Sequence, residues 1–466
     1  MNDLAFATAG EVAAAIHTGA VSSVEVLEES LTRIGRYNSK LNAIVTLDED
    51  GARRRALDAD AALRRGEIWG PLHGIPITLK DSHSTAGMRT TAGFPPLANY
   101  VPREDGTVAA RLKAAGAIIL GKTNVPTLLT QPQTDNPIFG RTNNPWNLER
   151  TPGGSSGGAA AAVSAGLIPL DIGSDFGGSI RMPAHFCGVF GFKPTARRVS
   201  MFGHIPDLPG KPRFDRVLSS CGPLARSVDD LILAFRLIVG PDGRDTEVPP
   251  VPIKEVSTPE MRELRIAWSP TFSGTPIAGD IREAIESFAT ALQQSGASVE
   301  EALPEISFEA QHLLWARYYK MLSFLITNVY GADPPGRTVA TEPPTMVEMM
   351  DVAEKRDEFI VAWDRFLDKW DVLLCPASMV TAFPHCPPGT PIHVDSETAK
   401  YGQVNHHCFP FNITGNPAVV IPIGRDREGL PIGVQVVGPR WRDERLLAIA
   451  KRISEVAGPI QHPPGY

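Results

Sequence analysis

Two serines in glycine-rich turns are the residues with the clearest capacity for chemistry. Ser155 lies in Gly153-Gly154-Ser155-Ser156-Gly157-Gly158, and Ser179 follows 24 residues later in Gly177-Gly178-Ser179-Ile180-Arg181. Glycine tolerates positive φ angles and close backbone approach, so such a loop can turn several N–H groups toward one point. Because converging N–H groups stabilise an oxyanion, the two turns indicate acyl-transfer chemistry at a serine hydroxyl.

Lys80 is the candidate base that such a hydroxyl requires. It ends the run Ile75-Pro76-Ile77-Thr78-Leu79, which predicts a strand that would hold the lysine rigidly. A lysine can act as a base where burial keeps it neutral. Alone, Lys80 would be read as a solvated surface residue, and Ser155 as an N-cap residue of the following alanine-rich helix. Only the combination of the three residues supports catalysis.

These motifs together resemble the amidase signature family. Lys80 and Ser155 are 75 residues apart, and this spacing and the 24 residues from Ser155 to Ser179 look like those of the family's Ser-cisSer-Lys triad. Most of the chain is covered, and residues from about 240 to 400 match weakly. Further matching segments are Gly121-Lys122-Thr123-Asn124, residues 188–195, Gly222-Pro223-Leu224-Ala225-Arg226 and residues 411–438.

The resemblance implies a role for each matching residue. Ser179 would be the nucleophile that accepts the acyl group, Ser155 the bridging serine with an unusual cis peptide bond, and Lys80 the base. An ion pair between Asp175 and Arg181 would fix the loop. The backbone N–H groups expected to hold the oxyanion are those of Phe176, Gly177, Gly178 and Ser179. The residues expected to support the network are Ser156, Ser174, Asp175 and Arg181.

The substrate is predicted less directly. We hypothesise that the substrates are small uncharged aryl or alkyl amides, and also carbamates and esters, since an acyl-serine mechanism accepts any sufficiently good leaving group. Phe176 departs from the smaller residue often found at its position, so the acyl side of the pocket can differ. The loops 128–139, 204–214 and 376–393 are expected to shape the pocket. Candidate substrate-binding residues are Gln131, Phe139, Trp315 and Tyr319, although an aromatic stripe at helical spacing equally suits an ordinary core.

Composition excludes several other classes of protein. The formal net charge of -7 and the lack of a run rich in lysine and arginine argue against a nucleic-acid partner. The five cysteines lack Cys-x-x-Cys spacing, which predicts reduced thiols in a cytoplasmic protein without a disulfide framework or zinc site. No secretory signal or apolar run long enough to cross a membrane is evident. We expect no metal and no cofactor, and the resemblance suggests a homodimer.

Four alternative interpretations fit parts of the sequence. The sequence Gly153-Gly154-Ser155-Ser156-Gly157 also fits the nucleophile elbow of a Ser-His-Asp esterase, but an elbow directly follows a strand and residues 143–151 form a polar loop. Residues 116–123 match the phosphate-loop pattern, yet their interior reads as a strand. The resemblance also allows the glutaminase subunit of a tRNA-dependent amidotransferase, which works with a partner chain. A silent binding protein would not require Lys80 and both serines.

The predicted fold class is α/β, with a mixed twisted β-sheet covered by helices on both faces. One amidase domain should span residues 1–466. Its expected parts are an N-terminal helical region (1–65), a signature core (66–240), a variable substrate-shaping region (241–400) and C-terminal core strands with a helix (401–466). Helices are expected twice within 9–36 and at 51–65, 107–115, 155–165, 227–239, 280–295, 308–329, 346–368 and 443–456. Strands are expected at 42–47, 75–80, 117–120, 167–172, 372–374, 419–423 and 432–437.

Overall fold

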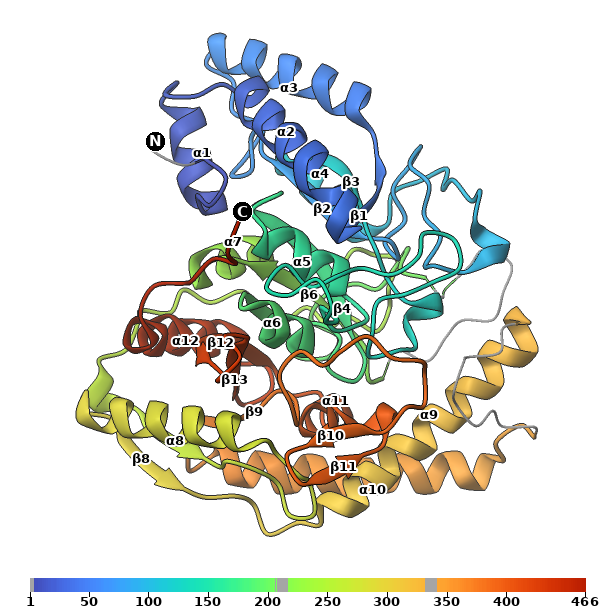
Figure 1. Cartoon of the computed structure of the whole chain (residues 1–466), viewed down its shortest axis with the longest axis vertical. Helices are drawn as coiled ribbons and strands as arrows, with labels where there is room; N and C mark the ends of the chain where they lie inside the picture. The colour runs from blue at the N-terminus through green and yellow to red at the C-terminus, as the bar shows by residue number, and fades with distance from the viewer. Residues whose placement is uncertain (1–3, 206, 208–216, 332–341) are drawn as a thin grey trace.

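The computed structural model describes residues 4–205, 207, 217–331 and 342–466, and in this part of the chain eleven strands form one mixed β-sheet (Figure 1). Neighbouring strands are parallel on both sides of β2 and of β7 and antiparallel elsewhere. In spatial order the strands are β1 (Ile44–Leu47), β3 (Ile118–Thr123), β2 (Pro76–Lys80), β4 (Leu170–Asp175), β6 (Ser220–Ala225), β5 (Phe190–Lys193), β12 (Ala418–Arg425), β13 (Pro431–Val437), β9 (Val372–Pro376), β7 (Arg265–Trp268) and β8 (Ser298–Glu301).

Helices cover both faces of this sheet, as the sequence predicted. Those packed in the largest apolar core are α1 (Ala9–His17), α4 (Thr107–Ala114), α7 (Val228–Ile238), α8 (Gly279–Gln294) and α12 (Asp443–Ala457). The helices of the opposite layer are α2 (Ser23–Leu41), α3 (Glu49–Arg64), α5 (Gly157–Ser164), α6 (Arg181–Cys187), α9 (Phe308–Tyr330), α10 (Met346–Leu367) and α11 (Phe409–Ile413). Short elements complete the fold: the hairpin of β10 (Ile392–Val394) and β11 (Glu397–Ala399), and the 3-10 turns η1 (Pro95–Leu97), η2 (Thr127–Leu129), η3 (Met261–Glu263), η4 (Tyr401–Gln403) and η5 (His406–Cys408).

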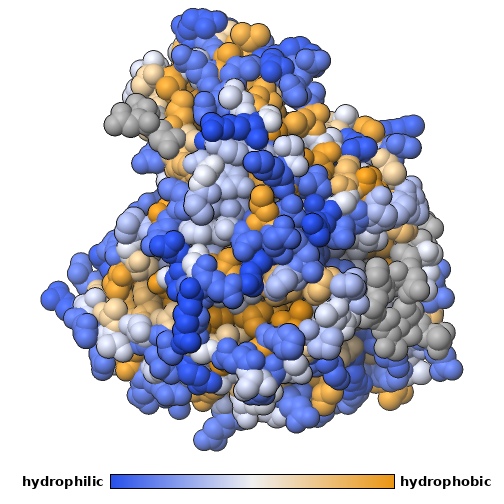
Figure 2. Space-filling view, viewed as in Figure 1, coloured by the Kyte–Doolittle hydropathy of each residue, from blue (hydrophilic) through white to orange (hydrophobic). Residues whose placement is uncertain are grey.

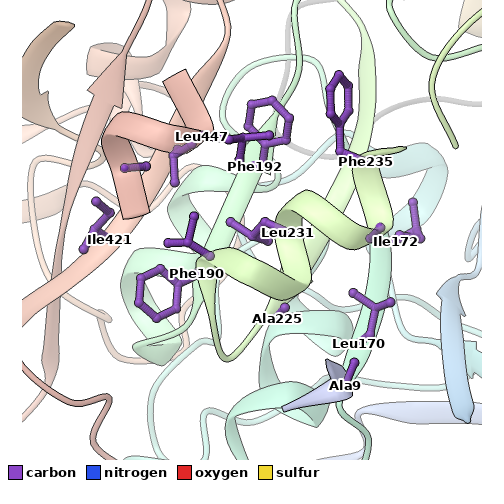
Figure 3. Packing of buried hydrophobic residues seen from close by; sticks show 14 of the residues in the cluster. Ala9, Leu170, Ile172, Phe190, Phe192, Ala225, Leu231, Phe235, Ile421 and Leu447 are labelled. Atoms are coloured by element: carbon purple, nitrogen blue, oxygen red, sulfur yellow. The ribbon is translucent and has the colours of Figure 1, made fainter. Parts of the chain in front are cut away.

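The alternating direction of side chains along the central strands explains why the sheet has an apolar core on each face. Val419 packs in the core on one face and Val420 in the core on the other, because successive side chains of a strand point to opposite sides. Phe192 of β5 contacts Phe235 of α7 with ring centroids 5.2 Å apart (Figure 3). Leu447 of α12 lies in the same packed layer. A sheet with two buried faces holds its strand ends firmly, and these strand ends position the site.

The surface of the molecule, unlike its core, is mostly hydrophilic. Hydrophilic side chains cover most of the face in Figure 2, with smaller apolar groups between them. The two ends of the described chain meet: Phe6 and His462 have ring centroids 4.0 Å apart, and Tyr37 and Tyr466 are 4.9 Å apart. Within the described residues, no helix has the length and apolar character needed to cross a membrane.

The expected helices and strands are present, with small differences in their ends. The strand expected at 167–172 is wrong in position, because β4 covers Leu170–Asp175. The elements that were not predicted are β5, β6, β7, β8, β10, β11, α6 and α11. Glycine and proline concealed β6: Gly222 lies so close to β5 that a Cβ atom there would stand 2.0 Å from the carbonyl oxygen of Phe192. The phosphate-loop alternative fails, since residues 118–123 are β3.

Candidate active site

Lys80 and Ser174 meet because their strands run side by side in the same direction. β2 and β4 are parallel, with Leu79 paired to Ile172. The carboxyl ends of parallel strands lie at the same edge of a sheet. Lys80 is the last residue of β2, and Ser174 is the penultimate residue of β4. The strand order of the sheet therefore brings together side chains that are 94 residues apart in the chain.

The amino group of Lys80 is fully buried among neutral oxygen atoms. Its Nζ atom donates to Ser155 Oγ at 2.7 Å, to Ser174 Oγ at 2.9 Å and to the Ser174 carbonyl oxygen at 3.2 Å. Burial lowers the pKa of Lys80 from its ordinary value to about 7, although nearby Cys221 and Asp175 favour the charged form. A substantial fraction of Lys80 is thus an uncharged amine near neutral pH.

Ser155 is held where the loop enters α5. The peptide bond between Gly154 and Ser155 is cis, as expected from the resemblance. Ser156 Oγ donates to the Ser174 carbonyl oxygen at 3.3 Å, so the next serine ties this turn to β4. The helix lies very close to the neighbouring backbone, since a Cβ atom at Gly158 would stand 2.4 Å from the backbone nitrogen of Asn124. This close approach positions the Ser155 hydroxyl within reach of Lys80.

Ser179 belongs to a loop wrapped around the carboxylate of Asp175. The N–H groups of Gly178 and Ile180 donate to the two oxygens of this carboxylate at 2.8 and 3.0 Å. Gly178 has a φ angle of 105°, which only glycine adopts readily. The Ser156 N–H donates to the Ser179 carbonyl oxygen at 3.1 Å, so the two serine turns are joined directly.

The expected set of oxyanion donors needs one correction. Four N–H groups were predicted to converge, but that of Gly178 is already used by Asp175. The N–H groups of Phe176, Gly177 and Ser179 have no acceptor within the described part of the chain. These three remain able to donate to a bound oxygen.

The predicted ion pair between Asp175 and Arg181 is present and fully buried. Arg181 Nη2 lies 2.9 Å from Asp175 Oδ1, and neither side chain has exposed surface. Burial alone would raise the pKa of Asp175, but the charge and hydrogen bonds of Arg181 outweigh it and hold this pKa well below its usual range. Asn412 also donates to the carboxylate at 2.9 Å, and Arg181 donates to the Cys408 carbonyl oxygen at 3.0 Å. The pair therefore connects the Ser179 loop to α11.

One narrow cavity of about 60 Å³ is lined by Ser155, Ser174 and Ser179. Most of the other walls are apolar or aromatic. They include Leu128, Leu129, Met201, Tyr319, Leu322 and Ile326.

Only one of the four candidate substrate-binding residues lines this cavity. Tyr319 does so, and Trp315 stacks on it with ring centroids 5.2 Å apart. Gln131 instead lines a neighbouring cavity with Gln133, and Phe139 lies under the Arg89 guanidinium at 4.7 Å, so neither is among the lining residues.

The loop expected at 128–139 does line the cavity, through Leu128, Leu129 and Thr130. Leu128 and Leu129 have φ angles of 48° and 64°, a conformation that their residue type does not signal. The walls that the sequence missed are Met201, Ser219, Leu322 and Ile326. The loop expected at 204–214 contributes His204, while residues 206 and 208–214 lie outside the described residues. Residues that could hold a metal ion were also missed: His83, His204 and Cys221 lie close together. The esterase alternative fails because residues 145–156, before α5, form turns instead of the strand that an elbow requires.

The chain is similar to known proteins in both sequence and structure. A family model described as "Amidase" matches residues 25–447. The A subunit of glutamyl-tRNA(Gln) amidotransferase from Roseiflexus castenholzii is 35% identical over 94% of this chain and 93% of its own length. A solved bacterial aryl acylamidase of the amidase signature enzymes has a TM-score of 0.85 and 26% identity, covering 97% of this chain and 96% of that one. A solved fatty acid amide hydrolase has a TM-score of 0.84 and 25% identity, over 98% and 86%.

Breaking the buried ion pair should strongly destabilise the protein. Arg181→Met leaves the Asp175 carboxylate buried without its counter-charge, and we expect the free energy of unfolding to fall by about 3–5 kcal/mol. Urea unfolding followed by circular dichroism measures this change. Lys451→Met, which removes the exposed partner of Asp229, is the matched control and should change stability by less than about 1 kcal/mol. Equal effects of the two substitutions would contradict a structural role for the buried pair.

Proposed function

Because this chain belongs to the amidase signature family of hydrolases that act on carbon–nitrogen amide bonds, we propose that it cleaves small uncharged aryl or alkyl amides through an acyl-enzyme intermediate. The observation that carries the proposal is the buried Lys80 amino group 2.7 Å from Ser155 Oγ, beside the cavity that Ser155 and Ser179 line. A charged lysine at this buried position would not stabilise the fold, since burying an ammonium ion costs several kcal/mol. A neutral lysine can accept a proton.

In the proposed mechanism the Ser179 Oγ attacks the amide carbonyl carbon. Its proton passes to Ser155 while the Ser155 proton passes to the neutral Lys80 amine, so charge never accumulates on either hydroxyl. The N–H groups of Phe176, Gly177 and Ser179 donate to the oxyanion of the tetrahedral intermediate. The same relay then returns a proton to the leaving nitrogen as the C–N bond breaks, and the acyl group remains as an ester on Ser179.

Water completes the cycle by the same route. It attacks the acyl ester, loses a proton through Ser155 to Lys80, and the second tetrahedral intermediate releases the carboxylic acid. Ser179 recovers its proton from the relay. Carbamates and esters with good leaving groups would enter the same sequence, because the attacking and stabilising groups do not depend on the leaving atom.

The cavity supports small uncharged substrates. The surface of its walls is mostly apolar, although polar side chains also line it, and apolar surface binds apolar groups by excluding water. Asp175 and Asp207 are the lining residues with acidic side chains, and the charge of Asp175 is balanced by Arg181. A zwitterionic amino acid would lose its hydration on entering such a pocket without an evident cationic partner for its carboxylate among these lining residues.

A second candidate function is that of a glutaminase subunit. The similarity to the A subunit of the amidotransferase over 94% of this chain favours it, because it covers the whole catalytic region as well as the weakly matching region. In that case the substrate would be glutamine, and activity would depend on a partner chain. The two candidates share the proposed relay and differ in the pocket and in the need for a partner.

The proposed roles of Ser179 and Lys80 predict two inactive variants. Ser179→Ala should prevent covalent labelling by a fluorophosphonate, and both Ser179→Ala and Lys80→Met should slow amide hydrolysis by about 10⁴-fold or more. Mass spectrometry of the intact protein measures the labelling, and steady-state kinetics measure the rate. Ser219→Ala, which changes another serine of the same cavity, is the control and should be labelled normally. Labelling of Ser179→Ala, or near-normal turnover by a folded Lys80→Met protein, would refute the relay.

The pH dependence tests whether Lys80 is the base. Below its pKa of about 7 Lys80 holds a proton and cannot accept another, so kcat/KM should rise about tenfold per pH unit and level off above this pKa. Asp171→Asn removes a nearby negative charge that favours the ammonium form, so the rising part of the profile should move to lower pH. Asp229→Asn changes an exposed carboxylate and should leave the profile unchanged. A flat profile from mildly acidic to alkaline pH would exclude Lys80 as the base.

A substrate panel separates the two candidate functions. We expect the purified chain alone to hydrolyse an anilide and an aliphatic primary amide faster than glutamine, with a carbamate also cleaved, because the cavity walls are apolar. Product release measured by liquid chromatography gives kcat/KM for each compound. Activity confined to glutamine, or activity that appears only after a second subunit is added, would overturn the small-amide proposal and support the glutaminase.

A further inference from the structure

A cluster of metal-ligating side chains lies beside the proposed relay but takes no part in it. His83 follows β2, His204 lies in the segment after β5, and Cys221 lies in β6. All three are buried. One ring nitrogen of each histidine and the Cys221 Sγ lie within 4.8 Å of one another, and within the described ranges of the chain no other such group occurs.

The backbone fixes the two histidines opposite each other. His83 and His204 form an antiparallel bridge, and the adjacent Ser84 N–H donates to the Gly203 carbonyl oxygen at 2.8 Å. The imidazole rings meet edge to face with centroids 5.1 Å apart. The two nitrogen ligands thus come from paired segments instead of a free loop, which favours a preformed site.

Two further observations point to a metal ligand. Nε2 of His83 is buried and has no hydrogen-bond partner within the described residues. A buried polar atom without a partner costs free energy, and a bond to a metal ion would remove that cost. In addition, the Cys221 thiol donates to Met201 Sδ at 3.2 Å, which adds a thioether beside the two nitrogens and the thiol.

The spacing is close to that of an occupied site. Metal bonds of about 2.0–2.1 Å to nitrogen and about 2.3 Å to sulfur place three ligands of a trigonal site about 3.5–4 Å apart. The three ligand atoms now lie up to 4.8 Å apart. They would therefore have to move about 1 Å closer together on binding a metal, which rotation of the side chains allows. We propose that His83, His204 and Cys221 bind a soft metal ion, Cu(I), with Met201 as a weak additional ligand.

The charges around the proposed site favour a monovalent metal ion over a divalent one. Thiolate and thioether ligands favour Cu(I), and two amino groups already lie nearby: Lys122 donates to the His83 carbonyl oxygen, and Lys80 contacts Ser174, the strand partner of Cys221. Binding releases the thiol proton to solvent and leaves the oxidation state of copper unchanged. Cu(I) and one thiolate have no net charge, whereas Zn²⁺ would leave one buried positive charge beside these amines.

The proposed metal site borders the cavity that Ser155 and Ser179 line. His204 and Met201 line it, so an ion can enter from the same side as a substrate. Cys221 is the register partner of Ser174, whose hydroxyl accepts from Lys80. Occupancy should therefore disturb the oxygen atoms around Lys80 and slow amide hydrolysis. This last consequence rests on the proposed relay, while metal binding itself does not.

Competition with a coloured chelator tests the site directly. Cu(I) is supplied without oxygen as its bicinchoninate complex, and loss of colour reports transfer to the full-length protein. We expect about one equivalent per chain to be transferred, with affinity reduced at least about tenfold in Cys221→Ser and in His83→Gln. Cys386→Ser changes a partly exposed cysteine outside the cluster and should bind like the wild type. X-ray absorption at the copper edge of the wild-type complex should show both sulfur and nitrogen ligands, which does not depend on any variant folding.

Three results would overturn the proposed copper site. No transfer to the wild-type protein, equal affinity of Cys221→Ser and wild type, or absorption showing sulfur ligands alone would overturn the site. Copper should also slow amide hydrolysis by the wild type far more than by Cys221→Ser, each compared with its own copper-free rate. Binding without such inhibition would refute the connection to the relay and leave the metal site standing. Lack of amide hydrolysis in copper-free protein would count against the proposed function, whatever the copper titration shows.

Discussion

The withdrawal of the Lys80 amino group from water is the constraint on which the site depends. Its three hydrogen-bond partners are neutral oxygens, two from hydroxyl groups and one from a carbonyl. Neutral partners offset part of the cost of burial without favouring the ammonium form as strongly as a contacting carboxylate would. The pKa of the amine therefore lies near 7, and this depends on β2, β4 and the entry to α5 keeping these contacts in place.

Asp175 carries a charge near Lys80, and the pKa of Lys80 nevertheless lies at about 7. Its carboxylate organises the Ser179 loop by accepting N–H groups on both oxygens, yet it also raises the pKa of Lys80 through its field. Arg181 offsets this effect, because its guanidinium lies 2.9 Å from the same carboxylate in a fully buried pair. One ion pair can thus shape the loop while limiting the field at the amine.

Much of this site could be predicted from the sequence, because residue type and local pattern act over short segments. Lys80 at the end of a β-prone run could be predicted, and so could the two serines in glycine-rich turns. The use of the Gly178 N–H by Asp175 could not, since it depends on how the loop folds back. The same holds for Leu128, whose positive φ angle carries no residue signature, and for Phe139, whose direction is set by its contact with Arg89. β6 was hidden by Gly222, which its close contact with β5 demands, and β5 by Gly191, which packs closely against Ala184 of α6.

Chemistry and selectivity come from different parts of the chain. The proposed reacting groups lie on strand ends and turns between Lys80 and Arg181, whereas one wall of the cavity belongs to α9, in the weakly matching region. That helix is anchored by Trp315, which stacks on Phe409 of α11 with ring centroids 3.8 Å apart. Substitutions on α9 can therefore reshape the cavity while Lys80 keeps its partners. Such separation explains how proteins that share this fold can act on amides as different as those in the names of its structural relatives.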